Sequence, residues 1–534
     1  PPPRELRGGL VEPAIMEIQV PEDVEVPDGP HALDDFECVG SYSWRKDLAD
    51  EKPIIEAPGC PVRWLDHDLP IQVQFDDEIR LYHENGYYMR GGSKLLPLLR
   101  ALEAFRNDES STGEEVHDLS ALDLSEVDIV TDRNNLRKLL RHAMEAQDEV
   151  ASTPLAATEN DAHTPLVSSN ADADANLNPD APLAGDRKTP DLNQKQIDSW
   201  AARRDFRIDL QLAGDKTLVM HRWAEFDREY VRPPKAGCRA NFVRAATAPL
   251  EGCERGTNHF RMVKYKFGGL TLLVRYEVDA CTSDTVLFRP PIEISTSADP
   301  APAPGVSPEE QTAATPAEAQ QSVHKSPESS SDITALHQET SAAIAEDPKP
   351  TGKPTLAYTS FDWSEAHCHD PPASSPPPSP ASSPAPAMPT APARDVHVVR
   401  AGTLLPQHAT LELATRSAKY VDRTTAEDTY LQLFLTQTPA HLVAVHERGV
   451  FARVDRQELA SDEFAEVAAR ERVRRGLARF GALLREIWGL AREHGRDHNV
   501  SLVCERGKME LLGNTGTEGL ASGEELDCFR ANRV

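Results

Sequence analysis

The sequence lacks an excess of basic residues, with 57 Lys and Arg against 86 Asp and Glu and a formal net charge of −29. A protein that coats nucleic acid through phosphate contacts usually carries a basic excess, so this composition excludes a polybasic coat. It leaves room for a small metal-dependent phosphodiester site, because such a site is itself acidic. The sequence also has no run of 18 or more apolar residues, and we expect no membrane-spanning helix.

Cysteine is scarce, and several motifs are missing. The eight cysteines are scattered and form no C-x-x-C pair, so we interpret them as reduced thiols in an intracellular protein. No apolar signal region follows the first residues, Pro1-Pro2-Pro3-Arg4. We therefore expect a nuclear or cytoplasmic protein rather than a secreted one. The G-x-S-x-G elbow of serine hydrolases is also missing.

Proline is abundant but unevenly placed. Of the 43 prolines, 19 fall between Pro300 and Pro392, and such a stretch cannot bury enough apolar surface to offset the entropy of ordering it. A second poor stretch, 144–195, is rich in Ala, Asp, Asn, Pro and Thr. The stretches 144–195 and 296–395 carry net charges of −7 and −9, which leaves −13 on the rest of the chain. We expect both stretches to be disordered insertions.

The rest of the chain falls into three blocks, 31–143, 196–295 and 396–534. We find no internal repeat, and both insertions fall between blocks, where they interrupt no predicted strand. The three blocks together are long enough for one large core or two modest ones. We therefore predict one core split by two insertions rather than three domains.

Periodicity predicts alternating strands and helices through these blocks. Alternating or apolar runs predict strands at 38–44, 53–59, 127–131, 206–212, 216–223, 262–267, 270–279, 397–399, 409–415, 441–445, 450–454, 502–504 and 509–512. Helical spacing predicts helices at 93–105, 134–144, 425–437 and 464–490. Thr425 and Asp428 are spaced like a capping box at the start of the third helix. The order indicates an α/β fold of the α+β type, with a mixed sheet flanked by helices.

Two of the predicted strands carry isolated carboxylates. Glu277 and Asp279 lie two positions apart at the end of one strand, so both point to the same face. Glu412 is the acid of a second strand. Three carboxylates that converge from neighbouring strands would form a hard oxygen site for Mg²⁺ or Mn²⁺, which can activate water and neutralise phosphate charge. The alternative is that these acids are solvated residues at strand ends.

Four short motifs follow one another along the chain: V-T-D-R at 130–133, Y-E-V-D-A-C at 276–281, L-E-L-A-T at 411–415 and Y-L-Q-L-F-L at 430–435. In this order they resemble the V-T-W-R-G, G-E-V-D-C, E-L-K-T and W-x-Q-S-F-L motifs of the decapping-exoribonuclease (DXO) family of RNA 5′-end processing enzymes. Each motif is short, and their shared order carries the resemblance. It extends from about residue 36 to 512, outside the insertions.

The resemblance implies a fold and a metal site. The fold would be a mixed β-sheet core of the PD-(D/E)XK nuclease type, flanked by helices and assembled from the three blocks. Glu277, Asp279 and Glu412 match the family's metal-binding acids, and the backbone carbonyl of Leu413 matches a further ligand. The implied cofactor is Mg²⁺ or Mn²⁺.

The resemblance also implies contacts to RNA. Arg133 and Gln432 match residues that contact the RNA 5′ end. A structural role stays open for each of them. Arg133 could cap or pair near the start of a helix, and Gln432 could be an ordinary amide on a helix surface.

Two positions depart from the family pattern. The family's catalytic lysine, two residues after the acid, is Ala414 here, and alanine cannot orient or help activate a water. The family's G-x-x-F-E segment, which supplies another acid, aligns loosely with 237–243 and places Val243 where the acid is expected. Lys264 and Lys266 on the neighbouring strand are candidates to replace the lysine, with surface charges as the alternative.

The implied function is metal-dependent RNA 5′-end processing, meaning decapping or 5′-pyrophosphate removal, with 5′→3′ exoribonuclease activity left open. The loss of lysine at Ala414 predicts a weakened activity. One alternative is an inactive family member that binds RNA or protein, and another is a scaffold whose acidic insertions recruit partners. The expected partners are RNA 5′ ends and, by family analogy alone, a 5′–3′ exoribonuclease. We expect a monomeric core without a membrane partner.

Overall fold

The computed structural model of this chain describes residues 4–49, 52–76, 80–82, 93–106, 123–152, 205–225, 229–231, 237–282, 395–423 and 425–529. The predicted insertion 296–395 lies, except for its last residue, outside the described residues. So does most of the insertion 144–195. Its expected start is wrong, however, because the helix α2 (Arg133–Ser152) continues past residue 144.

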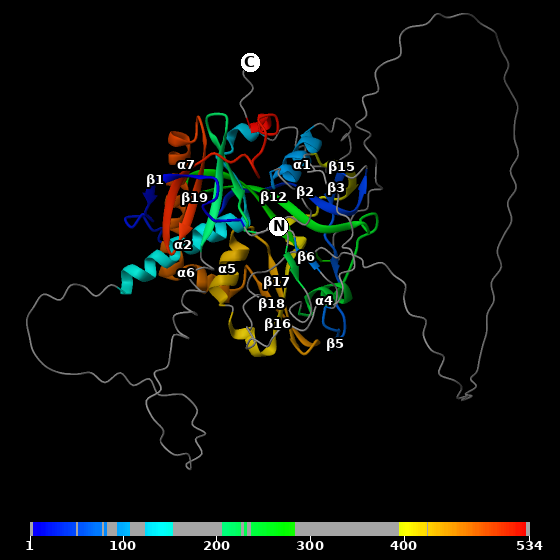
Figure 1. Cartoon of the computed structure of the whole chain (residues 1–534). Helices are drawn as coiled ribbons and strands as arrows, with labels where there is room; N and C mark the ends of the chain where they lie inside the picture. Colours follow the sequence, from blue (N-terminus) through cyan, green and yellow to red (C-terminus); the bar gives the residue numbers. More distant parts are fainter. Residues whose placement is uncertain are drawn as a thin grey trace, which may run out of the picture. The chain divides into compact units, whose positions relative to one another are not determined.

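The larger of two main sheets mixes parallel and antiparallel pairs. Its strand order within the described residues is β1 (Leu10–Ile18), β20 (Lys508–Asn514), β19 (Asn499–Glu505), β8 (Phe206–Ala213), β9 (Thr217–Arg222), β7 (Ile129–Asp132), β13 (Leu270–Val278), β12 (Gly256–Phe267), β2 (Asp34–Ala49), β3 (Lys52–Gly59) and β15 (His397–Gly402). Most pairs are antiparallel, whereas β7 runs parallel to β9 and β13, and β15 runs parallel to β3. Figure 1 shows β1 and β19 at one end of this sheet and β3 and β15 at the other.

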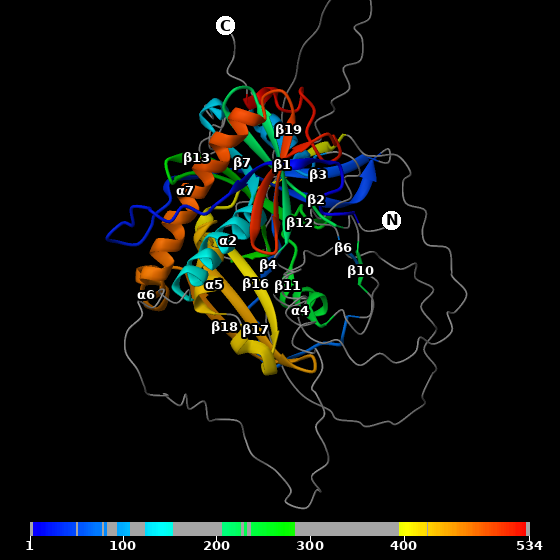
Figure 2. The same cartoon turned by 60° about the vertical axis from the view of Figure 1, so that its left-hand side comes forward.

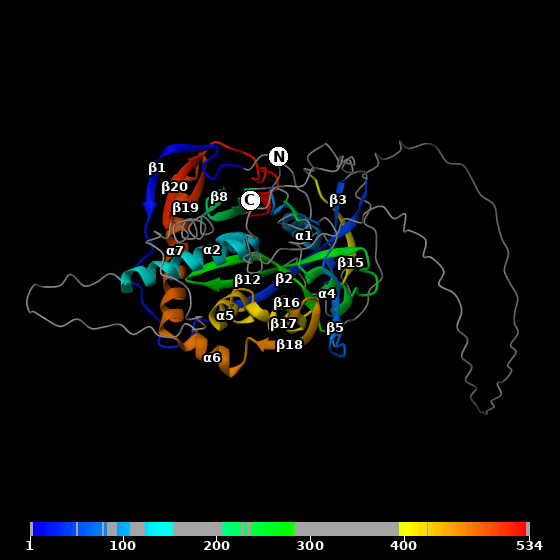
Figure 3. The same ribbon diagram turned by 60° about the horizontal axis from the view of Figure 1, so that its bottom comes forward.

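A second mixed sheet lies beside the first and contains the other carboxylate strand. Its order is β11 (Thr247–Ala248), β4 (Arg63–Trp64), β14 (Ala280–Cys281), β16 (Thr410–Ser417), β17 (Ala440–Glu447), β18 (Val450–Glu458) and β5 (Ile71–Gln72). Figure 3 shows β16, β17 and β18 together, with the helix α5 (Ala426–Phe434) alongside them. A short pair, β6 (Arg80–Tyr82) with β10 (Glu229–Val231), stands apart from both sheets.

Helices cover both faces of the larger sheet. On one face, α2 and α7 (Glu471–His494) lie side by side, with α6 (Asp462–Ala469) next to α7 (Figure 2). Their apolar residues share one core with β8, β12, β13 and β19, and α5 joins the same core. On the other face, α1 (Leu96–Arg106) packs over β2 and β3 in a second core. The short helix α4 (Arg239–Ala246) belongs to a smaller cluster beside the second sheet.

The structure confirms the predicted mixed α/β fold, and most predicted elements appear at their expected places. The capping box at Thr425 and Asp428 is present. The predicted helix 464–490 is instead two helices, because Arg470 has an extended ψ of 133° and ends α6 before α7 begins. The strand β1 lies before the first predicted block. None of the described helices is long and apolar enough to cross a membrane.

Candidate functional site

The candidate site lies where one strand passes from the larger sheet into the second sheet. β13 pairs with β7 up to Arg275 and with β12 up to Val278, and β14 begins at Ala280, which pairs with Leu411 of β16. Asp279 is the single residue between the two strands. Glu412 follows Leu411 directly, so the topology brings the carboxylates of β13 and β16 to one junction.

Glu412 is held by two residues that come from distant parts of the chain. Arg133 donates from Nη1 to Glu412 Oε2 over 2.7 Å and from Nη2 to Oε1 over 3.1 Å, which makes a bidentate ion pair. Gln432 donates from Nε2 to Glu412 Oε1 over 2.6 Å. The side chains of Arg133 and Glu412 are only 13 and 12% exposed. The structure therefore brings together one predicted metal-binding acid and both predicted RNA contacts.

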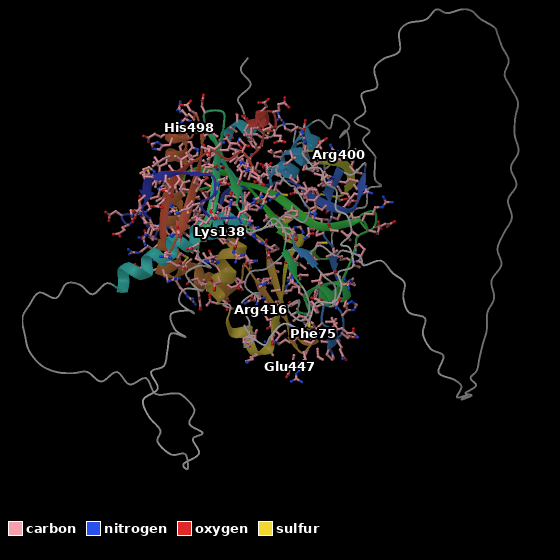
Figure 4. All side chains as sticks on the ribbon, viewed as in Figure 1. Phe75, Lys138, Arg400, Arg416, Glu447 and His498 are labelled. Carbon is pink, nitrogen blue, oxygen red and sulfur yellow. The ribbon has the colours of Figure 1, made fainter. Side chains whose placement is uncertain are left out.

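The local structure explains these positions. Arg133 is the first residue of α2 and follows β7 without a connecting loop, so its backbone is fixed by both elements. Gln432 lies in α5, whose first turn is closed by the capping box of Thr425. Figure 4 labels Lys138 on α2 and Arg416 on β16, which marks two of the elements that supply the site. Neither Arg133 nor Gln432 is an isolated surface side chain.

Asp279 is bound on both oxygens. The backbone N–H of Leu413 donates to Asp279 Oδ2 over 2.8 Å, and Arg239 donates from Nη2 to Oδ1 over 3.0 Å. The same guanidinium donates from Nη1 to the Leu413 carbonyl over 2.6 Å. The two groups that the resemblance implied as neighbouring metal ligands, Asp279 and the Leu413 carbonyl, are thus joined by one arginine.

Glu277 lies near the end of β13, two residues before Asp279. Asn258 of β12 donates from Nδ2 to Glu277 Oε1 over 2.7 Å. Tyr276, on the opposite face of β13, has Arg133 over its ring at 5.7 Å and accepts a 2.9 Å hydrogen bond from Gln407 Nε2. These contacts fix the end of β13 on both faces.

The electrostatics of the site reflect its burial. Burial raises the pKa of Asp279 to about 7; Arg239 opposes this shift, while Glu412 and Glu277 add to it. Burial alone would lower the pKa of Arg133, but Glu412 and Asp279 outweigh it and the net pKa is raised. Glu412 and Glu277 are therefore close enough to Asp279 to affect its pKa, and Arg239 and Arg133 supply the compensating charge.

The comparisons with known proteins concern the fold and one segment of the sequence. A family model described as a domain of unknown function (DUF8563) matches residues 195–351. No curated protein matches the chain.

In fold, this chain is similar to Rai1 and Dxo1. S. pombe Rai1 has 9% identity and a TM-score of 0.41, with 92% of this chain and 96% of that chain covered. Scheffersomyces stipitis Rai1, solved with (3′-NADP)+ and a calcium ion, has 10% identity, coverage of 97 and 99%, and a TM-score of 0.42. K. lactis Dxo1, solved with manganese, has 7% identity, coverage of 95 and 96%, and a TM-score of 0.35.

The departures from the family pattern have clear places in the structure. Ala414 is buried on β16, two residues beyond Glu412 and therefore on the same face of the strand. Val243 packs into the apolar cluster beside Phe242 and Phe451, and the residue of its helix that reaches the site is Arg239. The segment expected to supply an acid thus supplies an arginine.

Lys264 and Lys266, the candidates to replace the missing lysine, form ion pairs outside the site. Lys264 pairs with Glu37 at 3.1 Å, and Lys266 pairs with Asp35 at 2.6 Å. On β12 they lie opposite Leu273 and Thr271, whereas Glu277 lies opposite Phe260 near the other end of the strand. Both lysines therefore fit the alternative of surface charges.

The donor types at the junction suit a hard divalent cation, but their present arrangement does not. Carboxylate and carbonyl oxygens are the ligands that Mg²⁺ and Mn²⁺ prefer. Here Asp279 and the Leu413 carbonyl accept hydrogen bonds from Arg239, and both oxygens of Glu412 accept from Arg133. Among the described residues, no group of three or more His, Cys, Asp or Glu side chains stands close enough to hold a metal ion. A cation would have to displace an arginine first.

Proposed function

We propose that this chain processes RNA 5′ ends at the junction of its two sheets, and that hydrolysis there is slow. The observation that carries the proposal is the contact of Arg133 and Gln432 with Glu412. Their motifs lie far apart in the sequence, and each was singled out by its resemblance to one part of an RNA 5′-end site. A chance resemblance gives no reason for the three side chains to meet.

The chemistry of the two donors suits a terminal phosphate. The guanidinium of Arg133 is planar and permanently charged, and it can bind two oxygens of a phosphate side by side. It already binds a carboxylate in this way. The amide of Gln432 adds a neutral donor at the same place. A 5′-phosphate would compete with Glu412 for Arg133, so we expect micromolar rather than nanomolar binding.

The slow rate follows from the residues at two positions where the resemblance implies catalytic groups. Ala414 provides no charge and no proton, and Val243 faces an apolar cluster. General acid–base and electrostatic effects each contribute roughly 10²–10⁴-fold to an enzymatic rate. The loss of two such groups therefore reduces turnover by several orders of magnitude.

Arg239 favours a second candidate, which is an RNA 5′-end binding protein without hydrolysis. Its guanidinium bridges Asp279 and the Leu413 carbonyl, the two groups that an active metal site would need. In this candidate the fold and the RNA contacts remain while the chemistry is lost. The two candidates agree on the ligand and differ only in turnover.

Binding is tested first, because both candidates require it. Fluorescence anisotropy of the purified full chain would compare RNAs of one sequence that carry a 5′-triphosphate, a 5′-monophosphate or a 5′-hydroxyl. We expect the phosphorylated ends to bind at least fivefold more tightly, and Arg133→Ala to abolish this difference. Arg141→Ala is the matched control, because Arg141 is an exposed arginine of the same helix. Equal affinity for all three ends would contradict the proposal.

Turnover separates the two candidates. The assay would follow 5′-triphosphate RNA and unmethylated-capped RNA with Mn²⁺, and Glu277→Ala/Asp279→Ala would be the inactive control. Product from the native chain and none from the double variant supports slow processing. RNA bound without product supports the binding protein.

A further inference from the structure

Arg239 joins two sheet elements at the centre of the candidate site. Its Nη1 lies 2.6 Å from the Leu413 carbonyl oxygen, and its Nη2 lies 3.0 Å from Asp279 Oδ1. The side chains of Arg239 and Asp279 are 14 and 15% exposed. Because Leu413 also donates its N–H to Asp279 Oδ2, the arginine, the carboxylate and the backbone N–H and C=O of Leu413 form a closed ring of hydrogen bonds.

The helix that carries Arg239 is anchored at its first turn. The buried carboxylate of Asp76 accepts the backbone N–H groups of Ala240 and Asn241, at 3.2 and 2.8 Å. It thereby supplies the cap that Cys238 does not provide. Phe242 stacks on Phe451 of β18 with ring centroids 4.1 Å apart. The guanidinium is therefore placed by a fixed backbone rather than by a long loop.

The positive charge of Arg239 compensates the negative charges that surround Asp279. Asp279 is flanked by Glu412 and Glu277, and each of them disfavours its ionised form. Arg133 is bound to Glu412 through two nitrogens and contributes its charge there. Arg239 is the arginine that binds Asp279 directly. A divalent cation would occupy the same position for the same electrostatic reason.

We propose that Arg239 is the resident cation of this site, and that it competes with divalent metal for Asp279 and the Leu413 carbonyl. The native chain then binds Mn²⁺ weakly, and removal of the guanidinium exposes a metal site that the fold still holds. The inference rests on the proposed function only in taking these oxygens as the metal-binding set. It does not depend on RNA.

The test is a titration of the full chain with Mn²⁺, followed by the electron paramagnetic resonance signal of free Mn²⁺. Arg239→Gln removes at least one charged hydrogen bond, and losing one such bond corresponds to roughly a ten- to hundredfold change in an equilibrium constant. We expect Arg239→Gln to bind Mn²⁺ more tightly by this factor. Arg239→Gln/Asp279→Asn should lose the gain. Arg244→Gln is the matched control, because Arg244 lies in the last turn of the same helix and bonds to Asn241.

Two results would overturn the inference. One is an Arg239→Gln variant with native circular dichroism and an unchanged Mn²⁺ affinity. The other uses the native chain alone and applies even if the variant does not fold. Because Arg239 holds the site, about 1 mM Mn²⁺ should raise its Tm by less than about 1 °C. A rise of several degrees, abolished by Asp279→Asn, would mean that the arginine does not keep metal out. Neither result bears on RNA binding, so failure here is distinguishable from failure of the proposed function.

Discussion

A buried ion pair between Asp132 and Arg275 offers the sharpest test of the fold around the site. Arg275 donates from Nε and Nη2 to the two carboxylate oxygens of Asp132, over 2.6 and 2.9 Å. It also donates to the Lys94 carbonyl over 2.6 Å, and its side chain is only 2% exposed. The two residues are register partners on β7 and β13, and they directly precede Arg133 and Tyr276. The pair thus fixes both strands where they enter the site.

We expect Asp132→Asn to be severely destabilising, because it leaves the guanidinium buried without its counter-charge. Breaking a buried ion pair by removing one partner costs about 3–5 kcal/mol. For a unit of this size, that corresponds to a fall of roughly 5–8 °C in Tm. The double variant Asp132→Leu/Arg275→Met should recover most of the loss, since apolar residues of similar volume can replace a buried pair at little cost.

The assay is urea unfolding of the purified full chain, followed by far-ultraviolet circular dichroism. Asp455→Asn is the control, because the Arg453–Asp455 pair is 58 and 39% exposed and such surface pairs contribute about 0–1 kcal/mol. A loss of less than about 1 kcal/mol for Asp132→Asn would refute the reasoning. A double variant less stable than either single variant would refute it as well.

Three further predictions concern pH, helix capping and the missing lysine. Burial lowers the pKa of His221 to about 3, so the unfolded chain binds a proton that the folded chain rejects. His221 should therefore contribute a fall in stability of about 2 kcal/mol between pH 7.5 and 5, and His221→Gln should reduce the total fall in urea unfolding by this amount, with buried His259, whose pKa is also lowered, supplying part of the remainder; an equal fall in the native chain and the variant would contradict it. Thr425→Ala should cost about 1 kcal/mol by removing the cap of α5, and calorimetry at one pH measures it; an unchanged Tm would count against the cap. Ala414→Lys should raise Mn²⁺-dependent RNA hydrolysis at least about tenfold in a gel assay. No gain in a folded variant would place residue 414 away from the reacting group.

Local patterns in the sequence predicted the strands of the site well. β12 and β13 are long, apolar and joined at Gly268-Gly269, so their pairing is a short-range event that alternation reveals. The break at Arg470 was not predicted, because the apolar spacing continues across it from α6 to α7. The strand β1 was not predicted either, for a different reason. Most of its side chains are exposed or half-buried, so it has no alternating apolar face.

Within the site, Glu412, Arg133 and Gln432 were singled out from the sequence, and Arg239 was not. Glu412, Arg133 and Gln432 each lie in a short pattern that could be recognised on its own. Arg239 lies in the loosely aligned segment 237–243, but that pattern pointed to residue 243 and not to residue 239, and its partners Asp279 and Leu413 lie 40 and 174 positions away. Only the three-dimensional arrangement shows that α4 turns its first residue towards them. Whether Glu277, Asp279 and Glu412 bind metal stays a prediction.

The passage of one strand through both sheets ties the site to the folding of the whole core. Asp279 has its place only when β13 is in register with β12 and when Ala280 is in register with Leu411 of β16. A slip of one residue in either sheet would turn these carboxylates to the opposite face. A ligand at this junction therefore binds a state in which both sheets are complete. The binding free energy of such a ligand would add to the free energy of global unfolding, and not to the free energy of opening one loop. Occupancy of the site would therefore report whether both sheets are folded.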